Sequence, residues 1–199
     1  MQIIPKIDRK IVKLIEPDFE NGPWICGGAC IQWFQGKEVS KYSDIDIYFK
    51  NDAQRTEFVS NLTKKSLEDN AKFKFEHVVD TANAHTFNIK IDSNTWKLQA
   101  IKLYSGDTIQ DVLDQFDINA CKISTDGHQF VFGSDNTVQD ILYQKINIPV
   151  IKKNSISRVI KYMGKGYDLT EDAFDLLFNS NADLITDFNY DPNTEYNNE

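Results

Sequence analysis

Two aspartates one residue apart, Asp44 and Asp46, are the densest chemical feature of this chain. They alternate with isoleucines over residues 44–50, a pattern that predicts a β-strand with one apolar face. Side chains two residues apart in a strand point to the same face, so the two carboxylates would project side by side. Such a pair repels unless a cation neutralises it, and Mg²⁺ favours a few carboxylates together with water and substrate phosphates. The pair therefore predicts a site for Mg²⁺ or Mn²⁺.

A glycine pair, Gly27 and Gly28, precedes the aspartates and follows an apolar run. Glycines at such a position permit a tight turn and a close approach of the backbone to a ligand. Ser43 stands directly before the predicted strand, where its hydroxyl would contact a phosphate or form a hydrogen bond within a turn. Both alternatives remain open for Ser43 from the sequence.

The elements that must position these residues follow from periodicity and turn signals. We expect short helices over residues 8–15 and 29–34, a longer helix from residue 51 or 52 to about 65, and strands over 73–79, 85–91 and 96–104. A capped helix is predicted over 107–113, and strands over 116–124 and 129–132 flank an Asp-Gly hairpin signal. Helices are then predicted over 135–144, 155–163 and 170–178.

This order predicts an α+β fold, a mixed β-sheet backed by helices, with a C-terminal helical segment. We expect residues 1–134 to form the α/β core and residues 135–186 a helical, neck-like extension. Residues 187–199 are rich in Asn, Asp and Glu without periodicity, which predicts a disordered tail.

Composition limits the classes of function. The net charge of −8 and the pI near 4.9 give no basic footprint for a long nucleic-acid surface. No apolar run reaches membrane-spanning length, so we expect a soluble, cytoplasmic protein without a membrane partner. Cys26 and Cys30 are four residues apart, but a zinc site would need a second ligand pair at matching spacing. We therefore expect Cys26, Cys30 and Cys121 to be reduced, packed thiols.

Taken together, the apolar lead-in, Gly27-Gly28, a short helix and Asp-x-Asp on a strand resemble the signature of the polymerase-β-like nucleotidyltransferase superfamily. Downstream, Phe116-Asp117-Ile118-Asn119-Ala120 is similar to a motif of tRNA CCA-adding enzymes and bacterial poly(A) polymerases. The whole arrangement also resembles short nucleotidyltransferase-like proteins of phages and large DNA viruses, which would act in the host cytoplasm.

The resemblance implies that Gly27 and Gly28 hold a nucleoside triphosphate and that Asp44 and Asp46 bind two metal ions. Superfamily members generally add a third carboxylate from a neighbouring strand. The strand over 96–104 offers Gln99 there, which carries no charge, so Asp117 is our expected third catalytic and metal-binding acid. Asp117 as a structural acid is the open alternative.

Arg158 and Lys161 lie three residues apart on one predicted helix face, with Lys165 one turn on. This face is expected to bind the nucleotide; a solvated basic stripe is the alternative. The chain departs from the tRNA enzymes in lacking their arginine pair, which is replaced by Gln115 and Phe116.

The predicted activity is transfer of a nucleoside monophosphate from a nucleoside triphosphate to a hydroxyl acceptor by a two-metal mechanism, in which two ions roughly 3.5–4 Å apart stabilise the attacking and leaving oxygens. The acceptor, an RNA 3′ end, a protein or a small molecule, is not specified by any motif. Two alternatives remain: a catalytically degenerate nucleotide-binding or interaction protein of the same fold, and an AMP-transferring enzyme of the toxin or resistance type.

Overall fold

The computed structural model of the chain describes residues 4–39 and 43–180. The disordered tail predicted for residues 187–199 lies outside the described residues, as do the last residues of the predicted helical extension. Within residues 4–39 and 43–180, no helix is both long and apolar enough to cross a membrane.

A seven-stranded mixed sheet forms the centre of the molecule, with strand order β3-β4-β5-β2-β1-β6-β7. β2 and β5 run parallel, whereas the other neighbours in this sheet are antiparallel. The strands are β1 (Trp24–Cys26), β2 (Asp44–Phe49), β3 (Lys74–Asp80), β4 (Ala84–Ile91), β5 (Asn94–Ser105), β6 (Ile123–Thr125) and β7 (Phe130–Phe132). The short pair β8 (Lys145–Ile146) and β9 (Asp168–Leu169) forms a second sheet.

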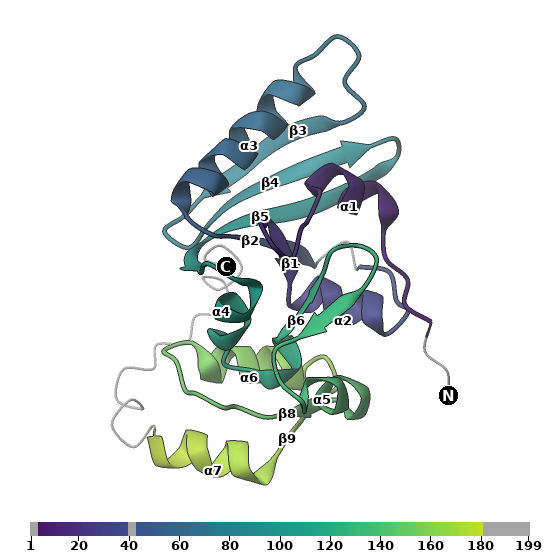
Figure 1. Cartoon of the computed structure of the whole chain (residues 1–199). Coiled ribbons are helices and arrows are strands. Elements are labelled where there is room, and N and C mark those ends of the chain that lie inside the picture. The colour runs from purple at the N-terminus through teal and green to yellow at the C-terminus, as the bar shows by residue number, and fades with distance from the viewer. Residues whose placement is uncertain (1–3, 40–42, 181–199) are drawn as a thin grey trace.

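Helices cover the sheet and continue beyond it. They are α1 (Arg9–Ile15), α2 (Gly28–Phe34), α3 (Asp52–Ser66), α4 (Ile109–Asp114), α5 (Thr137–Tyr143), α6 (Ser155–Met163) and α7 (Glu171–Ser180), with a 3₁₀ turn over Asn119–Cys121. Figure 1 shows α3 lying along β3, β4 and β5 at one end of the molecule, while α5, α6 and α7 gather at the opposite end. The α+β fold with a C-terminal helical segment is thereby confirmed.

Local sequence explains where several helices begin. Asp8 accepts hydrogen bonds from the first turn of α1, and Asn51 accepts one from Gln54 at the start of α3. Thr108 and Asp111 form a reciprocal capping box on α4, which satisfies two backbone donors that the helix leaves unpaired. The predicted helix starts are therefore close to the observed ones.

The main core lies on the face of β2 opposite the two aspartates. Ile45, Ile47 and Phe49 are fully buried there, and the ring of Phe49 lies 5.3 Å from that of Phe58 on α3. Burial of this apolar face on α3 supplies the driving force that sets the direction of every side chain along β2.

The prediction of one strand over residues 116–124 is wrong in its first part. Residues 116–122 form a loop and a 3₁₀ turn, and strand pairing begins only at Ile123. Hydrogen bonds of Asn119 explain the difference. Its side chain donates to Asp140 of α5 at 2.7 Å, and its backbone N–H donates to the Asn147 carbonyl at 2.9 Å. These bonds tie the segment to the helical extension instead of to a neighbouring strand.

Candidate active site

The side chains of Asp44 and Asp46 share one face of β2, and both are half-buried. In the strand register Asp44 is paired with Lys97 and Asp46 with Gln99, both on β5. On the other side of β2, Asp46 is paired with Cys26 of β1. The two carboxylates thus stand in the middle of the sheet, between strands from distant parts of the chain.

Asp46 belongs to a polar row that crosses five strands. Successive pairs in the register join Thr86, Gln99, Asp46, Cys26 and Ser124. The other four members are at most 3% exposed, whereas Asp46 is reached by solvent. Gln99 occupies the place beside Asp46 where the family resemblance suggested a charged acid, so this row carries a single carboxylate.

Asp44 has a different neighbourhood. Lys97 Nζ lies 3.0 Å from Asp44 Oδ1 as an ion pair in which the lysine side chain is 37% and the aspartate side chain 22% exposed. Asp44 Oδ1 is buried and has no hydrogen-bond partner among the described residues, because the ion pair lacks hydrogen-bond geometry. Lys97 is therefore a cation that already lies beside this oxygen, without a hydrogen bond to it.

The glycine pair lies beside the carboxylates, as the motif suggested. Gly27 has a positive φ of 75°, and a Cβ built on it would come 3.9 Å from Asp46 Oδ2. Gln32 Nε2 donates to Gly28 O and to Ser43 Oγ, both at 3.3 Å. Gly27, Gly28 and Ser43 are thus brought together with the two aspartates around one turn.

Asp117 has partners of its own. It is 2% exposed and accepts hydrogen bonds from Ser155 Oγ at 2.7 Å and from Arg158 at 2.8 Å. Although burial by itself would lower the pKa of Arg158, the charge of Asp117 and the bonds to it raise that pKa above its usual value. Across the part of the chain that the structure describes, no three His, Cys, Asp or Glu side chains form a group that could hold a metal ion. Asp117 is thus bound to Ser155 and Arg158, and its role as a third metal-binding acid stays a prediction.

Comparison with known proteins identifies the family. The model of the Gabija anti-defense 2 family matches residues 6–142, more than half of the chain. The chain belongs to the Gabija anti-defense 2 family. A search of curated proteins found no match.

Solved structures show the fold of this Gabija anti-defense 2 family chain. The Thermotoga maritima CCA-adding enzyme complexed with tRNA superimposes with a TM-score of 0.54 at 15% identity, covering 89% of this chain and 45% of the enzyme. A CCA-adding enzyme in complex with ATP gives 0.55 at 14% identity, with the same 89% and 45% coverage. The chain thus spans less than half the length of these enzymes, and the likeness confirms the nucleotidyltransferase fold that its motifs resemble.

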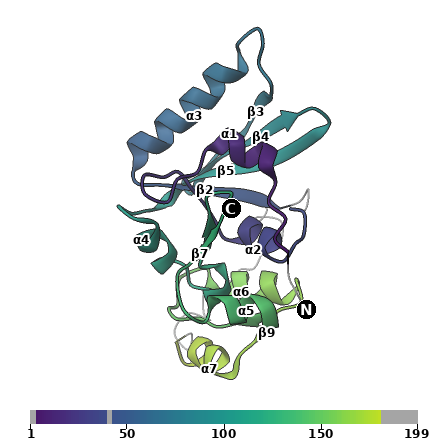
Figure 2. The same ribbon diagram turned by 45° about the vertical axis from the view of Figure 1, so that its right-hand side comes forward.

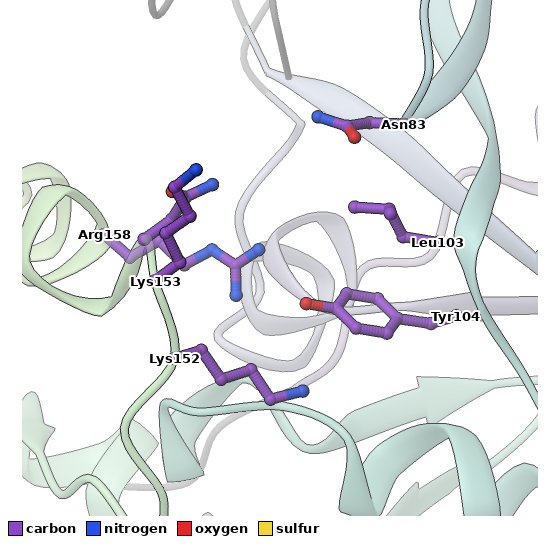
Figure 3. Close-up of a pocket in the computed structure, with 7 residues that line it drawn as sticks. Asn83, Leu103, Tyr104, Lys152, Lys153 and Arg158 are labelled. Atoms are coloured by element: carbon purple, nitrogen blue, oxygen red, sulfur yellow. The ribbon is translucent and has the colours of Figure 1, made fainter.

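A basic groove opens between the end of β5 and the start of α6 in this family member. It has a volume of about 350 Å³ and is lined by Asn83, Leu103, Tyr104, Lys152, Lys153, Asn154 and Arg158. Figure 3 shows the Arg158 guanidinium and the Tyr104 hydroxyl pointing toward each other across it. Lys152 Nζ lies 4.5 Å from the centre of the Tyr104 ring and donates to the Gln115 carbonyl.

Sequence reasoning selected Arg158 but missed the other groove residues. The adjacent Lys152 and Lys153, a few residues before Arg158, were the available signal, whereas Tyr104 and Asn83 carry none until β5 is placed. Lys161, predicted to share the role of Arg158, is exposed on α6 and is not among the groove-lining residues. Figure 2 shows α6 below α2, with α7 on its far side. The helix that bears Arg158 and Lys161 is thus the part of the C-terminal segment next to the α/β core.

Helix α6 also reaches the glycine turn. A Cβ built on Gly28 would lie 3.9 Å from the Tyr162 hydroxyl, and Cys121 Sγ donates to that hydroxyl at 3.0 Å. The same helix therefore contributes to the groove through Arg158 and to the wall of the glycine turn through Tyr162. The helical extension is part of the site's structure.

The chemistry of the two aspartates fits a divalent metal of the Mg²⁺ type. Mg²⁺ is usually bound by one or two carboxylates with water and substrate phosphates, without a complete protein cage. Asp44 and Asp46 supply that number of carboxylates, and Asp44 Oδ1 lacks a hydrogen-bond donor. The two thiols nearest the pair, Cys26 and Cys30, are fully buried, and burial raises the pKa of both.

Proposed function

We propose that the chain is a nucleotidyltransferase that transfers a nucleoside monophosphate from a nucleoside triphosphate to a hydroxyl acceptor. The observation that carries the proposal is the placement of Asp44 and Asp46 on one face of β2, beside the Gly27 turn. The acceptor oxygen forms a bond to the α-phosphorus while the bond to the β-phosphate oxygen breaks, which releases pyrophosphate and the hydroxyl proton. A divalent metal ion held by Asp44 and Asp46 supplies charge neutralisation at the phosphates.

The remaining residues have roles in binding. The turn at Gly27 and Gly28 lets the triphosphate approach the backbone closely, and the Ser43 hydroxyl, held by Gln32, faces the same turn. Arg158, fixed by Asp117 and lining the groove, contributes positive charge toward the anionic substrate. Lys161 lies on the same helix outside the groove and adds to the positive charge of α6. Asp117 therefore acts on the substrate through Arg158 and not as a metal ligand in this proposal.

In biological terms, we propose that the transfer serves phage anti-defence in the host cytoplasm, in keeping with the family name. The modified molecule is a component of the host defence or a small molecule on which that defence depends. A large nucleic-acid surface is not required, since the net charge is −8 and the basic groove is local.

Transfer is tested by incubating the full chain with each α-³²P-labelled nucleoside triphosphate, Mg²⁺ or Mn²⁺ and extract of a defence-carrying host. The ³²P label should appear in one kind of acceptor molecule. The double variant Asp44→Asn, Asp46→Asn should transfer label at least about a hundredfold more slowly than wild type, as expected when charge stabilisation of the transition state is lost. Asp69→Asn, which removes an exposed carboxylate elsewhere, is the matched control. Undiminished transfer by the double variant would exclude this site.

A catalytically degenerate, nucleotide-binding protein is the second candidate. Gln99 beside Asp46 and Lys97 beside Asp44 favour it, because no charged acid from β5 joins the pair. Metal-dependent nucleotide binding without transfer, together with anti-defence activity that survives the double variant in cells, would support this candidate over the enzyme. Transfer of AMP alone to a protein or small molecule would instead identify the toxin or resistance type.

A further inference from the structure

The parallel register between β2 and β5 places Lys97 beside Asp44, one of the two carboxylates proposed to bind metal. Lys97 is the direct neighbour of Asp44, with its Nζ 3.0 Å from Asp44 Oδ1. Both partners are more covered than those of the exposed pair Lys145 and Asp168, whose side chains are 44% and 74% exposed. The Lys97 ammonium thus lies directly beside the carboxylates, on a side chain that is 37% exposed.

Charge at the site limits how many metal ions the protein can hold. Asp44 and Asp46 contribute two negative charges, Lys97 one positive charge, and Gln99 none. One divalent ion on the aspartates would balance their two negative charges, and the Lys97 ammonium would bring the site to a net charge of about +1. A second divalent ion would therefore enter a site that is already positive and would be repelled by the ammonium beside Asp44. The absence of a three-ligand group among residues 4–39 and 43–180 agrees with low metal capacity.

We propose that Lys97 takes the place of one of the two cations of a two-metal site, so that the chain binds a single divalent ion at Asp44 and Asp46. This inference rests on the proposed function, since it concerns the cations of the same reaction. A lysine ammonium is a compact charge with three donors, well suited to bind a phosphate oxygen. In the nucleotide complex Lys97 therefore contacts both Asp44 and a phosphate of the substrate.

The experiment counts Mn²⁺ ions on the intact chain without nucleotide, by electron paramagnetic resonance of free Mn²⁺ during titration. Wild type should bind one ion, and Lys97→Met should bind two, or one at least about tenfold more tightly, because a repelling charge is removed. Lys97→Arg keeps the charge and should bind as wild type does. Lys90→Met, at an exposed lysine on β4, controls for loss of a lysine as such.

The outcomes separate this inference from the proposed function. Equal Mn²⁺ binding by wild type and Lys97→Met, or two ions on wild type, overturns the role of Lys97 and leaves the metal site intact. If neither protein shows Mn²⁺ binding that depends on Asp44 and Asp46, either alone or with a non-hydrolysable nucleoside triphosphate, the proposed function and the inference are overturned together. If Lys97→Met fails to fold in a thermal melt, the comparison of wild type with Lys97→Arg still decides: two ions on either protein contradict the inference.

Discussion

Arg158 donates a 2.8 Å hydrogen bond to Oδ1 of Asp117, which is 2% exposed and also accepts from Ser155. The pair joins the loop after α4 to helix α6, and so connects the α/β core to the helical extension. Because the arginine is partly exposed and lines the basic groove, one ion pair both holds the two parts together and aims a guanidinium at the groove.

Replacement of Asp117 by Asn should destabilise the chain by about 2–4 kcal/mol, because it leaves a partly buried arginine without its counter-charge. Urea unfolding monitored by tryptophan fluorescence measures this. Asp168→Asn, which breaks the exposed pair with Lys145, should cost no more than about 1 kcal/mol. Mn²⁺ binding by Asp117→Asn should equal that of wild type; a loss of metal binding in the folded variant would instead restore Asp117 as a ligand.

The glycine pair offers a contrast between neighbours. Gly27→Ala should cost about 1–3 kcal/mol, because φ 75° with ψ −135° is a backbone conformation that only glycine adopts without strain. Gly28 begins α2 with an ordinary φ, and an added Cβ would only touch the Tyr162 hydroxyl at 3.9 Å. Gly28→Ala should therefore be neutral, or stabilise by up to about 1 kcal/mol through helix propensity. Equal thermal stability of the two variants would argue against the strained turn.

His85 should make stability depend on pH. Its pKa is lowered below the usual value, mainly by burial, with Asp80 opposing the shift and His77 and Lys102 adding to it. In the unfolded chain His85 takes up a proton near pH 6.5, whereas in the folded chain it does so only at a lower pH. The free energy of unfolding is therefore at its full value above pH 6.5 and decreases as the pH falls toward the pKa of His85 in the folded chain. In urea denaturation measured between pH 7.5 and 5, the free energy of unfolding of His85→Gln should depend less on pH than that of wild type. If the free energy of unfolding of His85→Gln changes with pH as that of wild type does, groups other than His85 cause the pH dependence.

The three thiols should differ in their reaction with iodoacetamide. Cys26 and Cys30 are fully buried, and burial raises the pKa of both. Cys121 is partly exposed; burial raises its pKa to about 11, against the bond to Tyr162. Thiolate is the reactive form, so labelling near pH 8 should be slow and should reach Cys121 first, as mass spectrometry of timed samples would show. Fast labelling of Cys26 in the folded chain would contradict this order.

Features that depend on near neighbours in the chain could be predicted from the sequence. The alternation in residues 44–49 determined that Asp44 and Asp46 share a face and that Ile45 and Ile47 lie in the core. The capping position at residue 51 or 52 marked the start of α3, which begins at Asp52 after the cap Asn51. These signals are local because strand and helix periods are set by backbone geometry within a few residues.

Sequence motifs in order also determined the fold. The glycine turn, the aspartate pair and residues 116–120 together indicated a nucleotidyltransferase core, and the superposition on CCA-adding enzymes confirmed it. The same motifs could not determine the partner of Asp117, because its hydrogen bonds come from Ser155 and Arg158, about forty residues later.

Only the tertiary structure decided which charges surround the aspartate pair. Lys97 and Gln99 meet Asp44 and Asp46 because β5 pairs with β2 in one particular register, and a shift of one residue would have brought Leu98 to Asp44 instead. That register is set by burial of the apolar face of the whole sheet, and it cannot be read from any single segment of the sequence. The sequence therefore determined the two carboxylates, whereas folding across some fifty residues determined the lysine that shares their site.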